Sequence, residues 1–392
     1  MRALFSCLPG LGHFHPMVPL AQALSDAGHQ VAFATAERFC RRVVAPTGFE
    51  VFPAGLSPPE VEELMVNAPS DGDASLSDAA MGARMFAGVA GPAKVADLAR
   101  VIDAWGPSVV VHDTVDFGAP VAAAHAGLPW AGHSFGALQP SELWDRAAAL
   151  MAPTWREWGV RPGPAGGMFR YLYLDICPPA LQAPRIAGVA VARRLRPVIF
   201  DASGTTRLPD WVGHLRDLPT VYVTLGTVFN HTAGLFETVL EALGAEPANV
   251  VVTVGRDRHP GDLGEQPDNV RVEHYLPQSL LFPHCDLVVC HGGAGTTLAA
   301  LAHGLPLLIL PQGANQHWNG DRCAALGAGI TLSPNAITPA AVREAALELL
   351  GRPSYRAGAQ RVKAEIEAMP GPEAAVGLLE ELAQRQRPFT RD

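Results

Sequence analysis

A glycine-rich stretch in the last third of the chain joins an apolar run to a helical pattern. Leu287–Cys290 has the length and composition of a short buried strand, and Thr297–His303 is typical of a helix. Between them lies the stretch His291–Gly292–Gly293–Ala294–Gly295–Thr296. Glycines let backbone N–H groups approach a ligand, and a helix N-terminus attracts negative charge. The stretch predicts a phosphate-binding loop, with an ordinary tight strand-to-helix turn as the alternative.

A histidine follows the first apolar run of the chain. His13 closes the sequence Gly10–Leu11–Gly12–His13, which comes directly after Leu4–Leu8. At the carboxyl end of a strand, an imidazole is suited to take a proton from a hydroxyl near neutral pH. A local hydrogen bond at the start of a helix is the alternative. The turn is a poor dinucleotide fingerprint, because His15 stands where the third glycine is expected.

Two aspartates follow the apolar run Val109–Val111 and are candidate partners of this histidine. Asp113 ends that run, so we expect it at the same rim of the sheet as His13. A carboxylate in that place fixes the tautomer of an imidazole and stabilises the imidazolium. Asp116 is the rival, and His112 is expected to be a bystander.

Strand-like and helix-like patterns alternate along both halves of the chain. In the first half they are Leu4–Leu8, Pro16–Ala27, Val31–Thr35, Val109–Val111 and Ala119–Ala126. In the second half they are Thr220–Leu225, Ala233–Leu243, Val250–Val254, Asp286–Cys290, Leu305–Leu310, Ile330–Leu332 and Thr338–Leu350. This rhythm predicts α/β domains, each a doubly wound parallel sheet with helices on both faces. Ligands of such domains bind at the carboxyl ends of the strands.

The length of 392 residues and the restart of the rhythm predict two domains. We expect an N-terminal domain over residues 1–205, a linker over 206–215 and a C-terminal domain over 216–372. The remaining residues, 373–392, are expected to form a final helix that packs on either domain, including a crossing back to the first.

Two stretches of the first half interrupt the rhythm and are expected to be irregular insertions. They are residues 55–95 and Phe135–Tyr173. One interpretation is a pocket for a hydrophobic acceptor, and the other is loops packed on their own aromatic side chains. The pocket candidates are Met81, Met85, Phe86, Phe135 and Trp144.

Composition excludes several classes of protein. With 38 acidic and 29 basic residues the net charge is −9, and no basic run is present, which argues against a nucleic-acid partner. Six cysteines without a C-x-x-C pair predict neither a disulfide framework nor a zinc site, and no other metal site is expected. No apolar run approaches the ~18 residues of a membrane span, so we expect a cytoplasmic protein without membrane insertion.

Taken together, the motifs resemble the nucleotide-sugar-dependent glycosyltransferases of GT-B fold, of the family-1 type that includes antibiotic and macrolide enzymes. The resemblance spans nearly the whole chain. Its motifs are Gly-Leu-Gly-His13-x-x-Pro16, Val-Thr-Leu-Gly226-Thr227, Tyr275–Leu276–Pro277–Gln278, His291 to Thr297, and Pro311 to Gln316. The resemblance implies two Rossmann-like domains facing a cleft. It also implies an inverting, metal-independent transfer, with a TDP- or UDP-sugar as co-substrate and no cofactor.

The same resemblance implies roles for individual residues. His13 looks like the base that deprotonates the acceptor hydroxyl, with Asp113 orienting it. Tyr275 stands where many relatives stack a tryptophan on the base. The implied donor-binding residues are Gly12, Thr227, Tyr275, Leu276, Gln278, His291, Gly293, Ala294, Gly295, Thr296, Asn315 and Gln316.

An amide replaces an acid at one of these positions. Asn315–Gln316 matches the place where many family members hold the sugar with an Asp–Gln pair. An amide offers one acceptor and donors, whereas a carboxylate accepts from two hydroxyls. This favours a deoxysugar, as in a TDP-deoxysugar donor, although Asn315 holding glucose by weaker bonds is the alternative.

The leading hypothesis is thus sugar transfer to a hydroxyl of a hydrophobic natural product. The alternatives are other nucleotide-sugar chemistry, such as an epimerase or a lipid-acceptor transferase, and a non-catalytic nucleotide-sugar-binding helper. A homodimer is left open.

Overall fold

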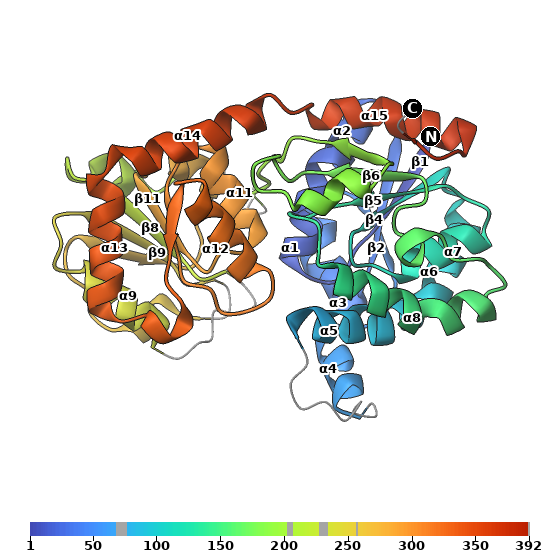
Figure 1. Cartoon of the computed structure of the whole chain (residues 1–392), viewed down its shortest axis with the longest axis horizontal. Coiled ribbons are helices and arrows are strands. Elements are labelled where there is room, and N and C mark those ends of the chain that lie inside the picture. Colours follow the sequence, from blue (N-terminus) through green and yellow to red (C-terminus); the bar gives the residue numbers. More distant parts are fainter. Residues whose placement is uncertain (68–76, 202–206, 227–233, 256–257, 391–392) are drawn as a thin grey trace. The chain divides into compact units, whose positions relative to one another are not determined.

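The computed structural model describes residues 1–67, 77–201, 207–226, 234–255 and 258–390, and the chain packs as two units (Figure 1). Unit 1 comprises Met1–Cys177, Gln182–Val198 and Pro370–Asp392, and unit 2 comprises Pro178–Leu181 and Ile199–Met369. The chain therefore passes to unit 2 at Val198, before the linker expected at 206–215. Within that stretch, Asp210–His214 forms a 3₁₀ turn that belongs to unit 2.

Unit 1 is built on a parallel sheet of seven strands in the order β3-β2-β1-β4-β5-β6-β7. The strands are β1 (Arg2–Ser6), β2 (Gln30–Thr35), β3 (Glu50–Pro53), β4 (Val109–Asp113), β5 (Trp130–His133), β6 (Leu172–Asp175) and β7 (Ala192–Arg194). Every residue of β4 is buried, as expected of a parallel strand covered on both faces. β4 continues two residues past the expected run and includes His112 and Asp113 themselves.

Helices cover the two faces of this sheet (Figure 1). The helices of unit 1 are α1 (Leu11–Phe14), α2 (Val18–Asp26), α3 (Glu37–Phe39), α4 (Pro58–Asn67), α5 (Asp78–Ala83), α6 (Gly91–Trp105), α7 (Gly118–His125), α8 (Ser141–Glu157) and α15 (Pro372–Arg385). The crossover direction reverses between β3 and β4, and right-handed connections then place α2 on one face and α6 with α7 on the other. α2 ends, as the sequence predicts, before Gly28, whose φ of +84° an L side chain rarely adopts.

The final helix packs on unit 1. α15 lies along α2, and the side chain of Glu380 meets His29 Nε2 at 2.9 Å (Figure 1). Residues 370–392 are therefore the third chain segment of unit 1, which is one of the two placements that the sequence left open for the final helix.

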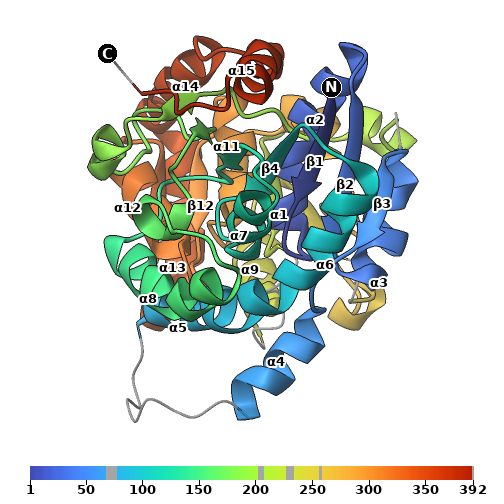
Figure 2. The ribbon, with the colours of Figure 1, turned by 90° about the vertical axis from the view of Figure 1, so that its right-hand side faces the viewer.

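The two interruptions are largely helical, so the expectation of irregular insertions is wrong. α4, α5 and a π-helical segment, Arg84–Ala90, occupy the first, and α8 occupies much of the second. Figures 1 and 2 show α4 standing out from the rest of unit 1. The sequence carries a signal for α8, because its buried residues recur at helical spacing. They are Leu143, Trp144, Ala147, Met151, Thr154 and Trp155.

Unit 2 has a second parallel sheet, of six strands in the order β10-β9-β8-β11-β12-β13. The strands are β8 (Thr220–Thr224), β9 (Asn249–Thr253), β10 (Val270–Glu273), β11 (Leu287–Cys290), β12 (Leu307–Ile309) and β13 (Gly329–Thr331). The helices are α9 (Leu235–Leu243), α10 (Gln278–Leu281), α11 (Ala294–Ala302), α12 (Gln316–Ala325), α13 (Pro339–Gly351) and α14 (Pro353–Glu367). α13 packs on α9, and α14 packs on α11. The prediction of two doubly wound parallel-sheet units is confirmed.

Candidate active site

The structure brings His13 and Asp113 together at the carboxyl edge of the unit 1 sheet. His13 lies in α1 just after β1, and Asp113 is the last residue of β4, which pairs directly with β1. His13 Nδ1 is 2.7 Å from Asp113 Oδ2, and the two side chains are 22% and 1% exposed. Among the described residues, neither atom has a hydrogen-bond partner elsewhere. The imidazole therefore has one nitrogen against a buried carboxylate.

Opposing effects set the protonation of this imidazole. Burial disfavours the imidazolium, but the charge and contact of Asp113, with a smaller contribution from Asp116, outweigh burial and raise the pKa of His13. A carboxylate behind the ring makes it a stronger base for a proton on the other nitrogen, Nε2.

Asp116, the rival partner, is held elsewhere. Its Oδ2 accepts hydrogen bonds from Lys94 Nζ and Ser6 Oγ, each at 2.6 Å, and Lys94 is 1% exposed. Burial raises the pKa of Asp116, but the charge and hydrogen bond of Lys94 and the bond from Ser6 overcome this and hold it below its usual value. The two aspartates are therefore distinguished by their partners.

Lys94 was missed by sequence reasoning. It lies on the apolar face of α6, in register with the buried Val95, Leu98 and Ile102. A lysine at helical spacing among buried apolar residues is the signal that could have drawn attention to it.

His112 is separated from the pair by the alternation of side chains along β4, where neighbours point to opposite faces. Its Nδ1 contacts the carbonyl oxygen of Asp113 at 2.9 Å, and burial lowers its pKa. It is buried away from solvent, in keeping with a bystander.

Two of the acceptor-pocket candidates flank His13. The rings of Phe86 and Phe135 meet its imidazole edge-on, with centroids 6.1 and 5.2 Å away. Phe86 comes from the π-helical segment Arg84–Ala90, a geometry that is often found at functional sites. Met85, which neighbours Phe86 in that segment, is half-buried against the core of unit 1.

The other two pocket candidates are not placed in this group. Met81 on α5 is exposed, and its side chain is one of the large apolar groups on the surface. Trp144 is buried in the core, where its ring packs against Phe117 and Phe169 and its indole N–H donates to the carbonyl of Gln139. The structure gives Trp144 a packing role.

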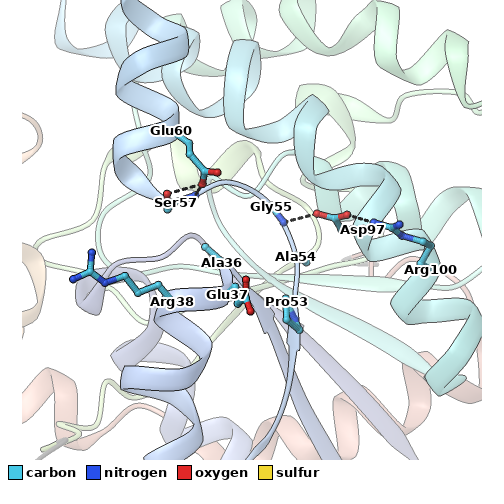
Figure 3. A pocket seen from close by; sticks show the side chains of 10 residues that line it. All are labelled: Ala36, Glu37, Arg38, Pro53, Ala54, Gly55, Ser57, Glu60, Asp97 and Arg100. Carbon is cyan, nitrogen blue, oxygen red and sulfur yellow. Dashed lines mark hydrogen bonds and ion pairs between the residues drawn. The ribbon is translucent and has the colours of Figure 1, made fainter.

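A separate pocket of about 480 Å³ lies past the ends of β2 and β3 (Figure 3). Charged side chains border it, among them Glu60, Asp97 and Arg100, and Asp97 accepts a hydrogen bond from the backbone of Gly55 at 2.9 Å. It contains none of the residues around His13. Its lining is polar, unlike the hydrophobic pocket that the sequence suggested.

In unit 2 the glycine-rich stretch leads from β11 into α11, which begins three residues earlier than expected. Gly293 is the N-cap of α11, and no side chain caps the helix. The backbone N–H groups of Ala294, Gly295 and Thr296 therefore have no acceptor within the helix. Such donors, together with the helix dipole, favour the binding of an anion at this end of the helix.

His291 is enclosed by glycines at the entrance to this helix. A Cβ at Gly226, where φ is +78°, would lie 2.5 Å from His291 Cε1, and one at Gly293 would lie 2.4 Å from Nε2. The ring is 9% exposed, and its Nδ1 has no hydrogen-bond partner in the described part of the chain. Burial lowers the pKa of His291 to about 4. The imidazole is therefore neutral at pH 7 and keeps one N–H to donate.

The residues expected around the nucleotide base adjoin a carboxylate. Asp201 accepts hydrogen bonds from the backbone N–H groups of Gln278 and Ser279 at 2.9 and 3.2 Å, and from the hydroxyl of Tyr275 at 3.4 Å. Tyr275 is 40% exposed, whereas Leu276 is buried. The sequence offers no signal for Asp201, because it lies in a stretch without periodic pattern.

The loop before α12 lies against the glycine-rich stretch. Gln316 is buried, and its side-chain oxygen accepts from the backbone N–H of Gln312 at 2.7 Å. Asn315 is half-buried at the N-cap of α12, and its side chain does not cap the helix. Asn319 donates to the carbonyl of Gly292 at 2.8 Å and joins the two loops.

Two further donor candidates complete the set. Gly12 is exposed in α1 of unit 1, with open space where a side chain would be. Thr227 lies outside the described residues.

One parallel-sheet unit holds a histidine–carboxylate pair, and the other holds a glycine-rich helix entrance with a buried histidine. This combination places the protein in the class of GT-B glycosyltransferases. The chain belongs to the family described as Erythromycin biosynthesis protein CIII-like. The N-terminal domain of that family matches residues 22–226, and the C-terminal domain matches residues 237–382.

Relatives and solved structures agree with this assignment. The chain is 34% identical to the L-demethylnoviosyl transferase of Streptomyces niveus over the full length of both proteins. The crystal structure of the glycosyltransferase SnogD from Streptomyces nogalater matches with a TM-score of 0.80 at 30% identity, covering 98% of this chain and 99% of SnogD. The spinosyn rhamnosyltransferase SpnG complexed with thymidine diphosphate matches with a TM-score of 0.79 at 28% identity, covering 97% and 100%. The chain is thus an antibiotic-type glycosyltransferase.

SpnG has also been solved complexed with spinosyn aglycone, and that structure matches with a TM-score of 0.80 at 28% identity, covering 97% of this chain and 100% of SpnG. In the described part of this chain, no helix has both the length and the apolar character needed to cross a membrane.

Proposed function

We propose that this glycosyltransferase moves a deoxysugar, with inversion and without a metal ion, from a thymidine diphosphate (TDP) donor to a hydroxyl of a hydrophobic small molecule. The observation that carries the proposal is the His13–Asp113 contact of 2.7 Å, flanked by the rings of Phe86 and Phe135. A base with an apolar surround is what a hydroxyl on a hydrophobic acceptor requires.

Unit 1 supplies the base. With Nδ1 against Asp113, His13 Nε2 accepts the proton of the acceptor hydroxyl while its oxygen forms a bond to the anomeric carbon. The bond between that carbon and the phosphate oxygen breaks on the opposite side. A single displacement of this kind inverts the anomeric configuration, and the nucleoside diphosphate carries away the electron pair.

Unit 2 supplies the groups for the leaving diphosphate. The free N–H groups at the start of α11 and its dipole stabilise the charge that develops on the phosphate oxygens. His291 adds a hydrogen bond from a neutral ring, so it contributes no charge that must be compensated when the site is empty. These donors are the basis for proposing a metal-independent reaction.

Two observations favour a TDP-deoxysugar. SpnG, a rhamnosyltransferase by name, has been solved with thymidine diphosphate. Asn315 in place of a carboxylate weakens the hold on a pair of sugar hydroxyls, which suits a sugar lacking one.

Calorimetric titration with TDP and UDP tests the donor site, and a transfer assay on hydrophobic polyhydroxylated acceptors with and without a chelator tests the reaction. We expect TDP to bind at least tenfold more tightly than UDP and the rate to be unchanged by the chelator. In competition between TDP-glucose and a TDP-deoxysugar, Asn315→Asp should shift the preference towards glucose. Asn335→Asp, the same change at an exposed residue of unit 2, is the matched control. Tighter UDP binding, loss of rate with chelator, or an unmoved preference would each refute the corresponding part.

A further inference from the structure

Lys94 is a buried cation beside the candidate catalytic pair, and it joins the loop that follows β1 to the loop that follows β4. Its Nζ donates to Asp116 Oδ2 at 2.6 Å and to the carbonyl oxygen of Cys7 at 2.7 Å. Cys7 directly follows β1 and precedes the helix of His13, and Asp116 lies in the turn that follows Asp113. One ammonium group thus touches both loops.

The side chain of Lys94 has little freedom. A Cβ at Gly55 would lie 3.0 Å from Lys94 Cγ, and one at Gly118 would lie 3.2 Å from Lys94 Cβ and 2.5 Å from the carbonyl oxygen of Gly91. The close approach of the loop after β3 and of α7 therefore encloses the stem of Lys94. This enclosure holds its ammonium group against Asp116 and the carbonyl oxygen of Cys7.

A buried ion pair is weak evidence for stability, because removing two charges from water costs several kcal/mol before their attraction is counted. Apolar replacements of similar volume are often as stable. The pair therefore calls for a reason other than stability, and the neighbouring His13 offers one.

Asp116 is a second carboxylate close to the pair, because its backbone N–H donates to the carbonyl oxygen of Asp113 at 2.9 Å, and its charge acts on His13 in the same direction as that of Asp113. Its Oδ1 is buried without a hydrogen-bond partner among the described residues. Without Lys94 it would be a buried anion that keeps the hydrogen bond from Ser6 but has lost the cation that compensates its charge, and it would gain from a contact with another proton donor or cation close by. His13 is such a group.

We propose that Lys94 is a positioning residue: it occupies Asp116, so that His13 has Asp113 as its single carboxylate partner and keeps the orientation that proton transfer needs. The inference rests on the proposed role of His13 as base. It assigns to Lys94 an effect on turnover, exerted through Asp116, and no contact with substrate.

The test compares Lys94→Met, which keeps the length of the stem without its charge, with the double variant Lys94→Met/Asp116→Asn. For Lys94→Met we expect kcat to fall about 10- to 100-fold, as for a displaced catalytic group. The KM for donor and the affinity for TDP should stay within about twofold, since the groups proposed to bind the diphosphate and the nucleotide base lie in unit 2. In the double variant no anion competes for His13, and kcat should recover at least tenfold over Lys94→Met. Lys363→Met, at the only other lysine of the chain, is the control and should match the wild type.

The inference is overturned if Lys94→Met keeps a kcat within about twofold of the wild type. It is also overturned if the double variant is no more active than Lys94→Met. In that case the loss of activity would come from lost packing, which a substitution at Asp116 does not restore. If Lys94→Met does not fold, the neutral double variant decides: a kcat within about tenfold of the wild type supports the inference, and a lower one refutes it. His13→Ala is run alongside. If His13→Ala remains active, the assignment of His13 as the base is refuted. If His13→Ala is inactive but Lys94→Met is active, only the inference about Lys94 is refuted.

Discussion

The candidate sites of the two units are built from different kinds of groups. The site in unit 1 is made of ionisable side chains, with His13 against a carboxylate and Asp116 against Lys94. The site in unit 2 is made of backbone N–H groups and a histidine whose pKa lies far below neutrality. Both sit after the carboxyl ends of central strands in similar parallel sheets. The difference therefore lies in chemistry and not in fold.

This contrast follows from what each site is proposed to do. A base must change its charge during the reaction, so unit 1 needs a partner that stabilises the charged form. A diphosphate arrives with its own charge, so unit 2 needs oriented donors, and the histidine at the entrance of α11 is neutral. Gly226 and Gly293 matter in unit 2 because a side chain at either position would meet the ring of His291.

The largest expected effect is in unit 1. Replacing His13 with alanine removes the base, and kcat/KM should fall about 10²- to 10⁴-fold. Because the groups proposed to bind the diphosphate and the nucleotide base are in unit 2, TDP affinity by calorimetry should be unchanged. An activity within a few-fold of the wild type would refute the assignment of the base.

The next effect is expected for Asp113→Asn, which keeps the shape of the side chain and removes its charge. The rate at its optimum should fall about 100-fold. The Asp113 carboxylate raises the pKa of His13 above the ordinary value of 6.5. When the solution is acidified, wild-type activity should therefore begin to decline at a pH above 6.5. In the variant this acid limb should move to lower pH. A pH–rate profile measures both effects, and an unmoved limb would break the assignment of the carboxylate.

In unit 2, Gly293→Ala tests a site that depends on backbone and space. The new methyl group would lie 2.4 Å from His291 Nε2 and must displace the ring at the entrance of α11. We expect TDP affinity to fall about 10- to 100-fold. Gly351→Ala, where nothing lies within 4 Å of the new methyl group, is the matched control in the same unit. Equal affinities for the two variants would mean that the diphosphate is bound elsewhere.

The smallest effect concerns a feature that the two units share. Burial lowers the pKa of His133 in unit 1 and of His291 in unit 2 to about 4 each. In the unfolded chain these two histidines bind a proton near pH 6.5, whereas in the folded chain they do not. Their contribution to the free energy of unfolding is therefore fully present above pH 6.5 and is lost as the pH falls towards 4. Between pH 6.5 and 5.5 each should lower the free energy of unfolding by about 1 kcal/mol.

Denaturant unfolding of the wild type and of His133→Gln and His291→Gln over this pH range measures the effect, and each variant should lose its share of the acid sensitivity. His13 acts in the opposite sense. Its raised pKa makes a contribution that is present below pH 6.5 and lost as the pH rises through that raised value.

Much of the fold was predictable because a parallel sheet buries its strands on both faces. Short apolar runs such as Val250–Val254 are then visible without any knowledge of neighbours, and β9 indeed spans Asn249–Thr253. The edge strands β3 and β10 escaped notice, since their partly exposed residues do not form such runs. α8 was missed because its stretch was interpreted as irregular and rich in aromatic residues, although the buried positions keep a helical period.

The sequence by itself determined the two βαβ rhythms, the glycine-rich entrance to α11 and the histidine after the first strand. These signals are local, because each depends on residue types within one turn or one strand. Only the tertiary structure decided between Asp113 and Asp116. The deciding partner, Lys94, is 22 residues from Asp116 in the chain and meets it only when α6 packs against the sheet. The protonation state and the orientation of a buried ionisable side chain depend on which partner lies next to it in space. The number of residues between the two in the sequence does not reveal that contact.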